Sequence, residues 1–376
     1  MNRDKVMNRD RIMNRKNVIY NKKTYKHMVI AAMLSLTMLT GCSGESKENQ
    51  LSYRQIGINS MQSGDYEGAI AAFDSALSQC VGKVGETEID ICYYKAAAQY
   101  AFGDVEGALA TYDALISYDD KDADAYYMRG CLKLQTGESD KAQEDFASAI
   151  KYNSGDYELY INIYENLSAY NLAAEGEEYL NKAFDVKGSD ADSLAYRGEI
   201  YYLLGQNENA LTELKAALDK GSTEANLVIA QVYEALGDSD MAEFHYKEYA
   251  KSPAADSEAM CALAEIEMAK QNYAEALSYV NQGLAMEQVT NRRELMQNQI
   301  ICMEYTGDFS GAWTVIQEYV KMYPDDTKAQ REFTFLKNRQ PEVQTEGEIV
   351  VQGEITAETE LEESTEDVGD TEESGQ

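Results

Sequence analysis

The sequence repeats itself at an interval close to 34 residues. A two-residue turn motif, usually Gly followed by an acidic or amide residue, occurs eight times, and three consecutive intervals are each 34 residues. The eight motifs are Gly64-Asp65, Gly103-Asp104, Gly137-Glu138, Asn171-Leu172, Gly205-Gln206, Gly237-Asp238, Gln271-Asn272 and Gly307-Asp308. A fixed period of this size is typical of solenoids, in which each unit is stabilised mainly by its neighbours.

Small and apolar residues keep fixed places within each unit. Five residues after the start of each turn the residue is small, and four residues further on it is apolar. The small residues are Ala69, Ala108, Ala142, Gly176, Ala210, Ala242, Ala276 and Ala312, and the apolar ones are Phe73, Tyr112, Phe146, Leu180, Leu214, Tyr246, Val280 and Ile316. A spacing of four places both residues on one face of a helix.

A second small residue precedes the turn by seven residues in six units. These residues are Gly57, Ala96, Gly130, Gly198, Ala230 and Ala264. Two small positions on successive helices allow their backbones to approach closely, and the Gly or Asn between them can end the first helix in the left-handed conformation. Each unit is therefore predicted to be a pair of helices in close contact.

This pattern resembles the tetratricopeptide repeat, a helix-turn-helix unit of 34 residues. The third unit matches best, with Tyr126, Gly137 and Phe146 in place, whereas the fourth has Tyr164 where Gly is expected and Gly176 where Ala is usual. The resemblance covers residues 50–326 and implies an all-α, right-handed superhelical solenoid of about eight helix pairs. Residues 327–340 are predicted to form a C-terminal capping helix. This fold hosts many unrelated roles.

Residues 1–41 have the layout of an export signal. Lys22, Lys23 and Lys26 precede an apolar run over residues 28–39, which is shorter than the roughly 20 residues that a membrane-spanning helix needs. The run ends in Leu39-Thr40-Gly41-Cys42, which resembles the lipobox of bacterial lipoproteins. That resemblance implies lipidation of Cys42 and a membrane anchor on the extracytoplasmic side, with residues 42–49 as a linker. The alternative is an ordinary cysteine after a signal.

The chain is strongly acidic, with a formal net charge of −33. Such a chain repels phosphate backbones, so nucleic acid is excluded as a partner and a cationic partner is favoured. The alternative is that the charge only keeps an exposed protein soluble. Residues 341–376 hold 13 acidic and no basic residues and are predicted to be disordered, either as an arm for a cationic partner or as a solvated extension.

The sequence lacks the motifs of the common catalytic and cofactor sites, so we expect no enzyme, no cofactor and no metal. His245 is expected to be a partly exposed helical residue. Asp120, Asp122 and Asp124 have the first spacings of a calcium loop but not its later residues, so they are expected to cap a helix. Cys92, Cys131, Cys261 and Cys302 are interpreted as buried thiols, and Cys80 and Cys92 either form a disulfide or stay reduced.

In the tetratricopeptide family, the first helices of successive units line a concave groove through their second, fifth, ninth and twelfth positions. In this sequence those positions are rich in acids and tyrosines. The candidate groove residues are Asp90, Tyr93, Tyr100, Asp124, Tyr127, Glu165, Asp192, Glu199, Tyr202, Glu224, Glu234, Glu258, Glu265, Glu294 and Glu304. The resemblance implies a binding scaffold whose partner is a cationic or extended segment of another exported or envelope protein.

Two alternatives apply to this groove. An acid in the first turn of a helix is stabilised by the helix dipole without any ligand, which accounts for the acids at the second position but not for those further along. The second alternative is a cell-surface solute or glycan binder, in which the tyrosines would be stacking platforms and the acids hydroxyl acceptors.

Overall fold

The computed structural model describes residues 42–80 and 84–339. The predicted export signal at 1–41 and the acidic tail at 341–376 lie outside the described residues. The α-helices are α2 (Cys42–Gln62), α3 (Tyr66–Ser78), α4 (Glu86–Phe102), α5 (Val105–Tyr118), α6 (Ala123–Gln135), α7 (Ser139–Tyr152), α8 (Tyr157–Ala169), α9 (Ala173–Lys182), α10 (Ala191–Leu203), α11 (Asn207–Asp219), α12 (Ala225–Leu236), α13 (Ser239–Tyr249), α14 (Ser257–Ala269), α15 (Tyr273–Leu284), α16 (Arg292–Thr306), α17 (Phe309–Met322) and α18 (Thr327–Asn338). A 3₁₀ turn, η1 (Ala183–Asp185), follows α9.

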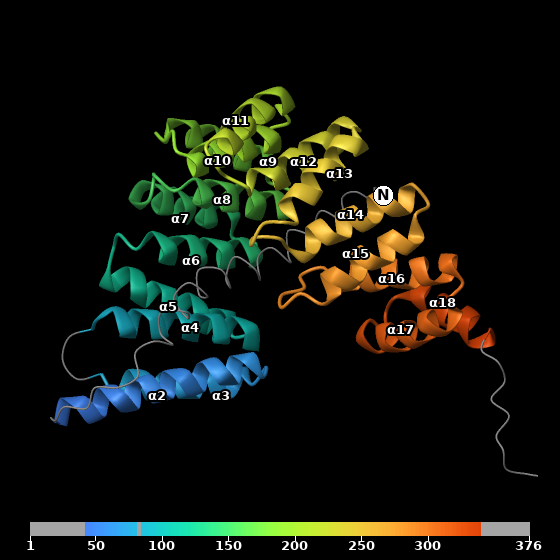
Figure 1. Ribbon diagram of the computed structural model, residues 1–376. Coiled ribbons are helices and arrows are strands. Elements are labelled where there is room, and N and C mark those ends of the chain that lie inside the picture. The colour runs from blue at the N-terminus through green and yellow to red at the C-terminus, as the bar shows by residue number, and fades with distance from the viewer. Residues whose placement is uncertain (1–41, 81–83, 340–376) are drawn as a thin grey trace, which may run out of the picture.

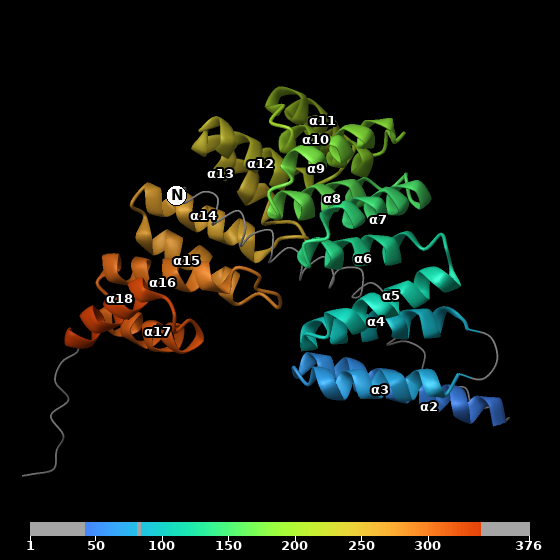
Figure 2. The same cartoon turned by 180° about the vertical axis from the view of Figure 1, so that it is seen from behind.

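These helices form eight antiparallel pairs, from α2 and α3 to α16 and α17, and α18 covers the last pair. The pairs follow one another along an arch (Figures 1 and 2). Within the described residues, first helices of successive pairs touch, as in α2 with α4, α8 with α10, and α14 with α16, whereas second helices of successive pairs make no comparable contact. The first helices therefore lie on the inner side of the curve.

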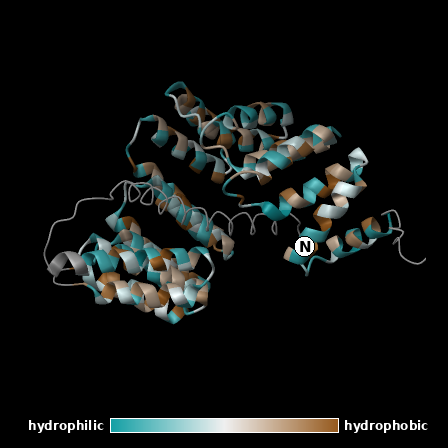
Figure 3. Cartoon of the chain, turned by 60° about the horizontal axis from the view of Figure 1, so that its bottom comes forward, coloured by the Kyte–Doolittle hydropathy of each residue, from teal (hydrophilic) through white to brown (hydrophobic). Residues whose placement is uncertain are grey.

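The repeated positions are the core of each pair. All eight small residues after the turns are buried, and the apolar residues four positions later are at most 3% exposed. The first residue of each turn has a positive φ in all eight units, including Asn171 and Gln271, where the residue is not glycine. In Figure 3, hydrophobic and hydrophilic segments alternate along the same helices, as expected when each helix buries one stripe. The predicted solenoid of eight helix pairs with a capping helix is confirmed.

The small residues before the turns are required by close packing. A Cβ atom on Gly57 would lie 2.5 Å from the Phe73 ring, and one on Gly198 would lie 2.4 Å from the Leu214 side chain. The fourth unit exchanges the sizes, because Tyr164 takes the small position and a Cβ atom on Gly176 would meet its ring at 2.9 Å. The fourth unit is therefore a regular pair in which the large and small partners have changed helices.

Ala142→Leu tests this packing. Ala142 is fully buried, and its carbonyl oxygen would lie 3.2 Å from a Cβ atom on Gly130. The extra side chain should overpack the contact between α6 and α7 and lower the free energy of unfolding by about 1 to 3 kcal/mol. Ala147→Leu, at an exposed position of the same helix, is the matched control and should leave the thermal melt unchanged. Equal melts for the two variants would contradict the register.

The structure differs from the sequence prediction at the start of the first helix. Residues 42–49, predicted to be a linker, form the first turns of α2. Ser46 Oγ donates to the Gln79 carbonyl oxygen at 2.5 Å, and Gln50 Nε2 donates to Glu88 Oε1 at 2.9 Å. These contacts with the end of α3 and the start of α4 extend the helix beyond the repeat. No helix among the described residues has the length and apolar character needed to cross a membrane.

Candidate functional site

The inner side of the arch carries carboxylates that helix capping does not use. Asp122, Asp156, Asp190 and Asp256 stand at the N-caps of α6, α8, α10 and α14, and each accepts a hydrogen bond from a backbone N–H of the first turn. The predicted capping role is confirmed for Asp122, which accepts from the Ala125 N–H at 3.0 Å. Because aspartates already cap these helices, the acids two residues after each cap are not needed for capping. They are additional negative charges that the helix dipole stabilises.

The candidate groove residues differ widely in exposure. Those that are exposed are Tyr100, Asp124, Asp192, Glu224, Glu234 and Glu265. Those that are half-buried are Asp90, Tyr93, Glu199, Tyr202, Glu258, Glu294 and Glu304. Tyr127 and Glu165 are buried, at 9% and 8% exposure. Accessible surface for a partner therefore comes mainly from the first group.

Several predicted groove residues connect neighbouring units. Tyr127 packs its ring on Phe146, and its hydroxyl accepts from Asn166 Nδ2 on α8 at 2.9 Å. Burial raises the pKa of Tyr127 well above its usual value, so the phenol stays neutral. Since α6 and α8 approach closely here, Tyr127 and Glu165 offer little surface to a partner, contrary to the expectation.

Two further residues near the N-terminal end are engaged with other helices. Asp90 forms an ion pair with Arg54 of α2, with 2.6 Å between Oδ2 and Nε. Tyr93 donates its hydroxyl to Asp122 Oδ1 at 2.6 Å, and burial together with this carboxylate raises the pKa of Tyr93. Both side chains join consecutive helix pairs, so they stabilise the stack at this end.

Four exposed acids remain in the middle of the arch. Asp192 lies on α10, Glu224 directly precedes α12, Glu234 lies in the last turn of α12, and Glu265 lies on α14. Within the described part of the chain, none of these four carboxylates has a Lys or Arg nitrogen within 4.0 Å. We call these four residues the inner acidic face. Unpaired like charges on neighbouring helices attract cations.

Glu304 has a different environment, against the capping helix. Its Oε1 atom is buried without a hydrogen-bond partner among the described residues. Burial and the neighbouring Glu332 carboxyl of α18 raise the pKa of Glu304 to about 7, and Arg339 opposes this shift. Glu304 therefore belongs to the contact between α16 and α18 and not to the inner acidic face.

This raised pKa makes the capping contact sensitive to pH. A carboxyl whose pKa is higher in the folded state than in the unfolded state stabilises the fold at low pH, and that stability is lost as the pH rises from about 4.5 through 7. Glu304→Gln should make the loss between pH 5 and pH 8 smaller by roughly 1 kcal/mol, since the group is only partly buried. Urea denaturation at both pH values measures this. Glu318→Gln, at an exposed position of α17, is the control. An equal effect of this variant would contradict the assignment of the pH dependence to Glu304.

His245 is buried, so the prediction of a partly exposed residue is wrong. It is 7% exposed, its Nδ1 lies 2.8 Å from Asn226 Oδ1, and its ring stacks on Tyr233. Burial and Lys215 lower the pKa of His245. The position next to Tyr246 faces the first helix of its own pair, so His245 joins α12 to α13.

Among the described residues, the cysteines and the acidic residues form neither a disulfide nor a metal site. Cys80 and Cys92 are free thiols, and burial raises the pKa of both. Cys261 and Cys302 are buried as predicted, whereas Cys92 and Cys131 are half-buried. Over residues 42–80 and 84–339, no group of three His, Cys, Asp or Glu side chains could hold a metal ion.

One aromatic feature was missed by the sequence reasoning. Tyr273 and Tyr305 stack with 4.1 Å between ring centroids and an angle of 5° between the rings. The signal for Tyr273 was an aromatic residue two positions after the start of the turn, which occurs in the first, seventh and eighth units as Tyr66, Tyr273 and Phe309. No repeated position marks Tyr305.

Comparison with known proteins agrees with the fold. Two tetratricopeptide-repeat family models match this chain, one at residues 60–130 and the other at residues 123–156 and 223–255. Residues 60–156 and 223–255 therefore match tetratricopeptide repeats. Proteins built from such repeats generally bind protein partners, and their families are generally non-enzymatic.

The curated relatives share only part of their length with this chain. DnaJ homolog subfamily C member 3 of Mus musculus is 26% identical over 215 residues, which are 52% of this chain and 42% of the relative. The protein of the same name from Gallus gallus is 23% identical over 267 residues, which are 65% of this chain and 51% of the relative. The chain spans about half the length of these relatives.

Solved structures that match this chain have low sequence identity and TM-scores below 0.5. A tetratricopeptide repeat protein from Parabacteroides merdae is 14% identical, with a TM-score of 0.47, over 68% of this chain and 99% of that one. PilW, described as a widely conserved type IV pilus biogenesis factor, is 21% identical, with a TM-score of 0.38, over 53% of this chain and 93% of that one.

Proposed function

We propose that this protein is a membrane-anchored extracytoplasmic scaffold that binds a cationic or extended segment of another exported or envelope protein and catalyses no reaction. The inner acidic face is the observation that carries this proposal. Its four carboxylates are exposed and lie on or beside three successive first helices, where a segment that follows the arch would meet them in turn.

Charge decides the class of partner. Carboxylates without cationic neighbours attract a cationic segment over about one Debye length, roughly 8 Å at physiological ionic strength, and they repel nucleic acid. A partner held in this way should be sensitive to salt. A pull-down from detergent-solubilised membranes with the full chain as bait should retain a basic protein at low salt and release it at about 0.5 M salt. Retention of only salt-insensitive partners would contradict a charged binding face.

The anchor is the second part of the proposal. It rests on Leu39-Thr40-Gly41-Cys42 after a short apolar run, and Cys42 is followed directly by the helical residues of α2. Two acyl chains on one residue hold a protein stably at a membrane, whereas one chain gives only marginal binding.

Cys42→Ala should abolish lipid labelling and release of the signal segment. Metabolic labelling with a fatty-acid analogue, together with the mass of the mature N-terminus, measures both. Cys80→Ala is the matched control and should be labelled and processed normally. A Cys42→Ala protein that still carried lipid and was still processed would show that the anchor lies elsewhere.

A further inference from the structure

The capping helix α18, at the end of the arch (Figure 1), is basic although the chain is strongly acidic. Residues 327–339 hold four Lys or Arg and one Glu, whereas the whole chain has a formal net charge of −33. Four exposed residues are spaced three, four and four positions apart, namely Lys328, Arg331, Phe335 and Arg339. Residues three or four apart are neighbours on a helix surface, so these four form one line along α18. We call this line the basic stripe.

Two cations of the basic stripe are not explained by the fold. Within the described part of the chain, neither Lys328 nor Arg331 has an Asp or Glu oxygen within 4.0 Å. The helix dipole stabilises cations at the C-terminal end of a helix, which accounts for Arg339 at the C-cap. Lys328 lies in the first turn, where the dipole disfavours a cation. The charges of Lys328 and Arg331 are therefore available to an anionic ligand.

Phe335 adds apolar surface between these cations. Its side chain is 46% exposed, although the Arg339 guanidinium carbon lies 4.8 Å from the centroid of its ring. The same guanidinium carbon lies 4.3 Å from the centroid of the Phe309 ring on α17, which holds Arg339 against the body of the last pair. A ligand complementary to the basic stripe therefore combines carboxylates with apolar side chains.

The segment that directly follows α18 has this composition. Residues 341–376 hold 13 acidic and no basic residues. Within 341–352, three carboxylates are accompanied by an apolar run, namely Glu342, Glu346, Glu348 and Ile349-Val350-Val351.

This segment is also long enough to cover the basic stripe. At about 1.5 Å per residue, the helix from Lys328 to Arg339 is roughly 17 Å long, which about five extended residues span. A ligand joined to its site by so short a connection has an effective concentration on the order of 1 mM or above. Weak electrostatic attraction therefore suffices within one chain, whereas an acidic segment of a second copy has no such advantage.

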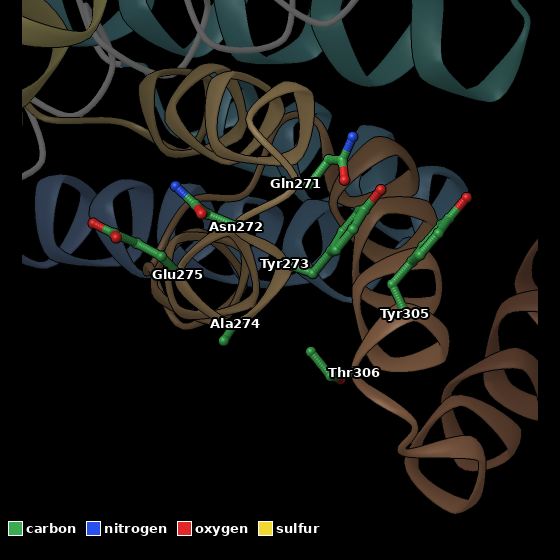
Figure 4. Close-up of a pocket in the computed structure, with 7 residues that line it drawn as sticks. All are labelled: Gln271, Asn272, Tyr273, Ala274, Glu275, Tyr305 and Thr306. Carbon is green, nitrogen blue, oxygen red and sulfur yellow. The ribbon is translucent and has the colours of Figure 1, made fainter.

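The other surfaces described above do not attract an acidic segment. The inner acidic face has the same sign of charge and repels it. The shallow pocket at Tyr273 and Tyr305 (Figure 4) is lined by one carboxylate, Glu275, and by no Lys or Arg, so it offers no compensating charge.

We propose that residues 341–352 bind the basic stripe of their own α18, with their carboxylates beside Lys328 and Arg331 and their apolar run against Phe335. The contact covers the outer side of the capping helix and closes it to acidic partners. This inference depends neither on the proposed protein partner nor on the proposed anchor.

NMR spectra of the ¹⁵N-labelled full chain, solubilised in a neutral detergent, test this contact through two glycine amides. Gly347 lies in the proposed contact, and Gly375, near the end of the chain, is the internal reference. The ratio of the Gly347 signal to the Gly375 signal should rise at least about twofold between about 0.05 M and 0.5 M salt, because screening releases the segment. Lys328→Glu with Arg331→Glu should give the high ratio already at low salt.

The matched control reverses two cations elsewhere. Lys187→Glu with Lys215→Glu changes the net charge equally, at exposed positions without an ion pair to the described residues, and should leave the ratio low at low salt. Trp313, the single tryptophan of the chain, packs on Phe333 of α18 with 4.9 Å between ring centroids, so its emission reports whether α18 stays in place. If the double reversal alters that emission, Lys328→Gln with Arg331→Gln, which adds no negative charge, takes its place in the comparison.

Three outcomes would overturn the assignment. The first is a ratio that changes neither with salt nor with removal of the two cations. The second is a low ratio that is lost on about tenfold dilution, which would place the contact between two copies, since an intramolecular contact does not depend on concentration. The third is retention of the full chain on phosphatidylglycerol vesicles that requires Lys328 and Arg331 while the Gly347 signal stays strong, which would make the stripe a membrane contact. The inner acidic face stays intact throughout, so failure here leaves the scaffold proposal standing.

Discussion

Asp145→Ala is expected to lower the free energy of unfolding by about 3 kcal/mol. Asp145 is 3% exposed and accepts two hydrogen bonds from Arg129, at 2.6 Å from Nη2 and 2.9 Å from Nε. Lys133 Nζ lies 2.8 Å from the same carboxylate. Removing the Asp145 carboxylate leaves two largely buried cations, Arg129 and Lys133, beside each other without their shared anion. Arg129 keeps one bond to Asp113, which places the effect at the lower end of the range for broken buried pairs.

Asp113→Ala is the matched control for this ion pair. Asp113 binds the same guanidinium at 2.6 Å, but its side chain is 60% exposed, so its loss should change stability by less than about 1 kcal/mol. Urea denaturation of the two variants gives both values. Similar losses would mean that burial of Asp145 does not control the strength of the pair, and a loss below 1 kcal/mol for Asp145→Ala would contradict the packing of α6 on α7.

The sequence predicted what is local to each unit. The turn position requires a left-handed backbone and the small residues allow two helices to touch, and both requirements recur every 34 residues or so. They could therefore be recognised even in the fourth unit, where Tyr164 and Gly176 exchange sizes. Local backbone conformation and helix contact within a pair depend on residues close in sequence, which is why the pattern predicts them.

Contacts between units could not be predicted in this way. Tyr127 was assigned to the groove, yet it is buried. Its hydroxyl accepts a hydrogen bond from Asn166, which lies 39 residues further along the chain. How closely α6 approaches α8 depends on the curvature of the whole stack, and the repeat pattern does not predict that curvature. The same reason explains α2, which begins eight residues before the predicted solenoid and whose first turns contact the end of α3 and the start of α4.

Ion pairs also decide which acids on the second helices are suitable control positions. Glu213 and Glu243 lie on the second helices α11 and α13. In the structure, Glu213 binds Arg197 at 2.7 Å, and Glu243 binds both Lys247 and Lys270. Reversing either charge would break these pairs. Exposed acids on second helices that make no ion pair with the described residues, such as Glu144, Glu177 and Glu208, are therefore better controls.

Reversing three charges of the inner acidic face is expected to slow association with a cationic ligand by about 10- to 100-fold at low salt. Asp192→Lys, Glu224→Lys and Glu265→Lys lie on or directly before three successive first helices, and each of the three carboxylates is exposed. Charges that line a concave face concentrate their field there, so they act mainly on the rate of encounter. The variant should also lose most of the salt dependence of that rate.

The association rate of a decalysine peptide with the full chain, measured at about 0.05 M and 0.5 M salt, tests the central claim most directly. The triple reversal of the inner acidic face should slow association at low salt by at least about tenfold. Glu144→Lys, Glu177→Lys and Glu208→Lys, which change the net charge equally on second helices, should slow it by less than about threefold. Equal rates for the two triple variants, with unchanged thermal melts, would mean that only the net charge attracts cations and would contradict a binding site on the inner face.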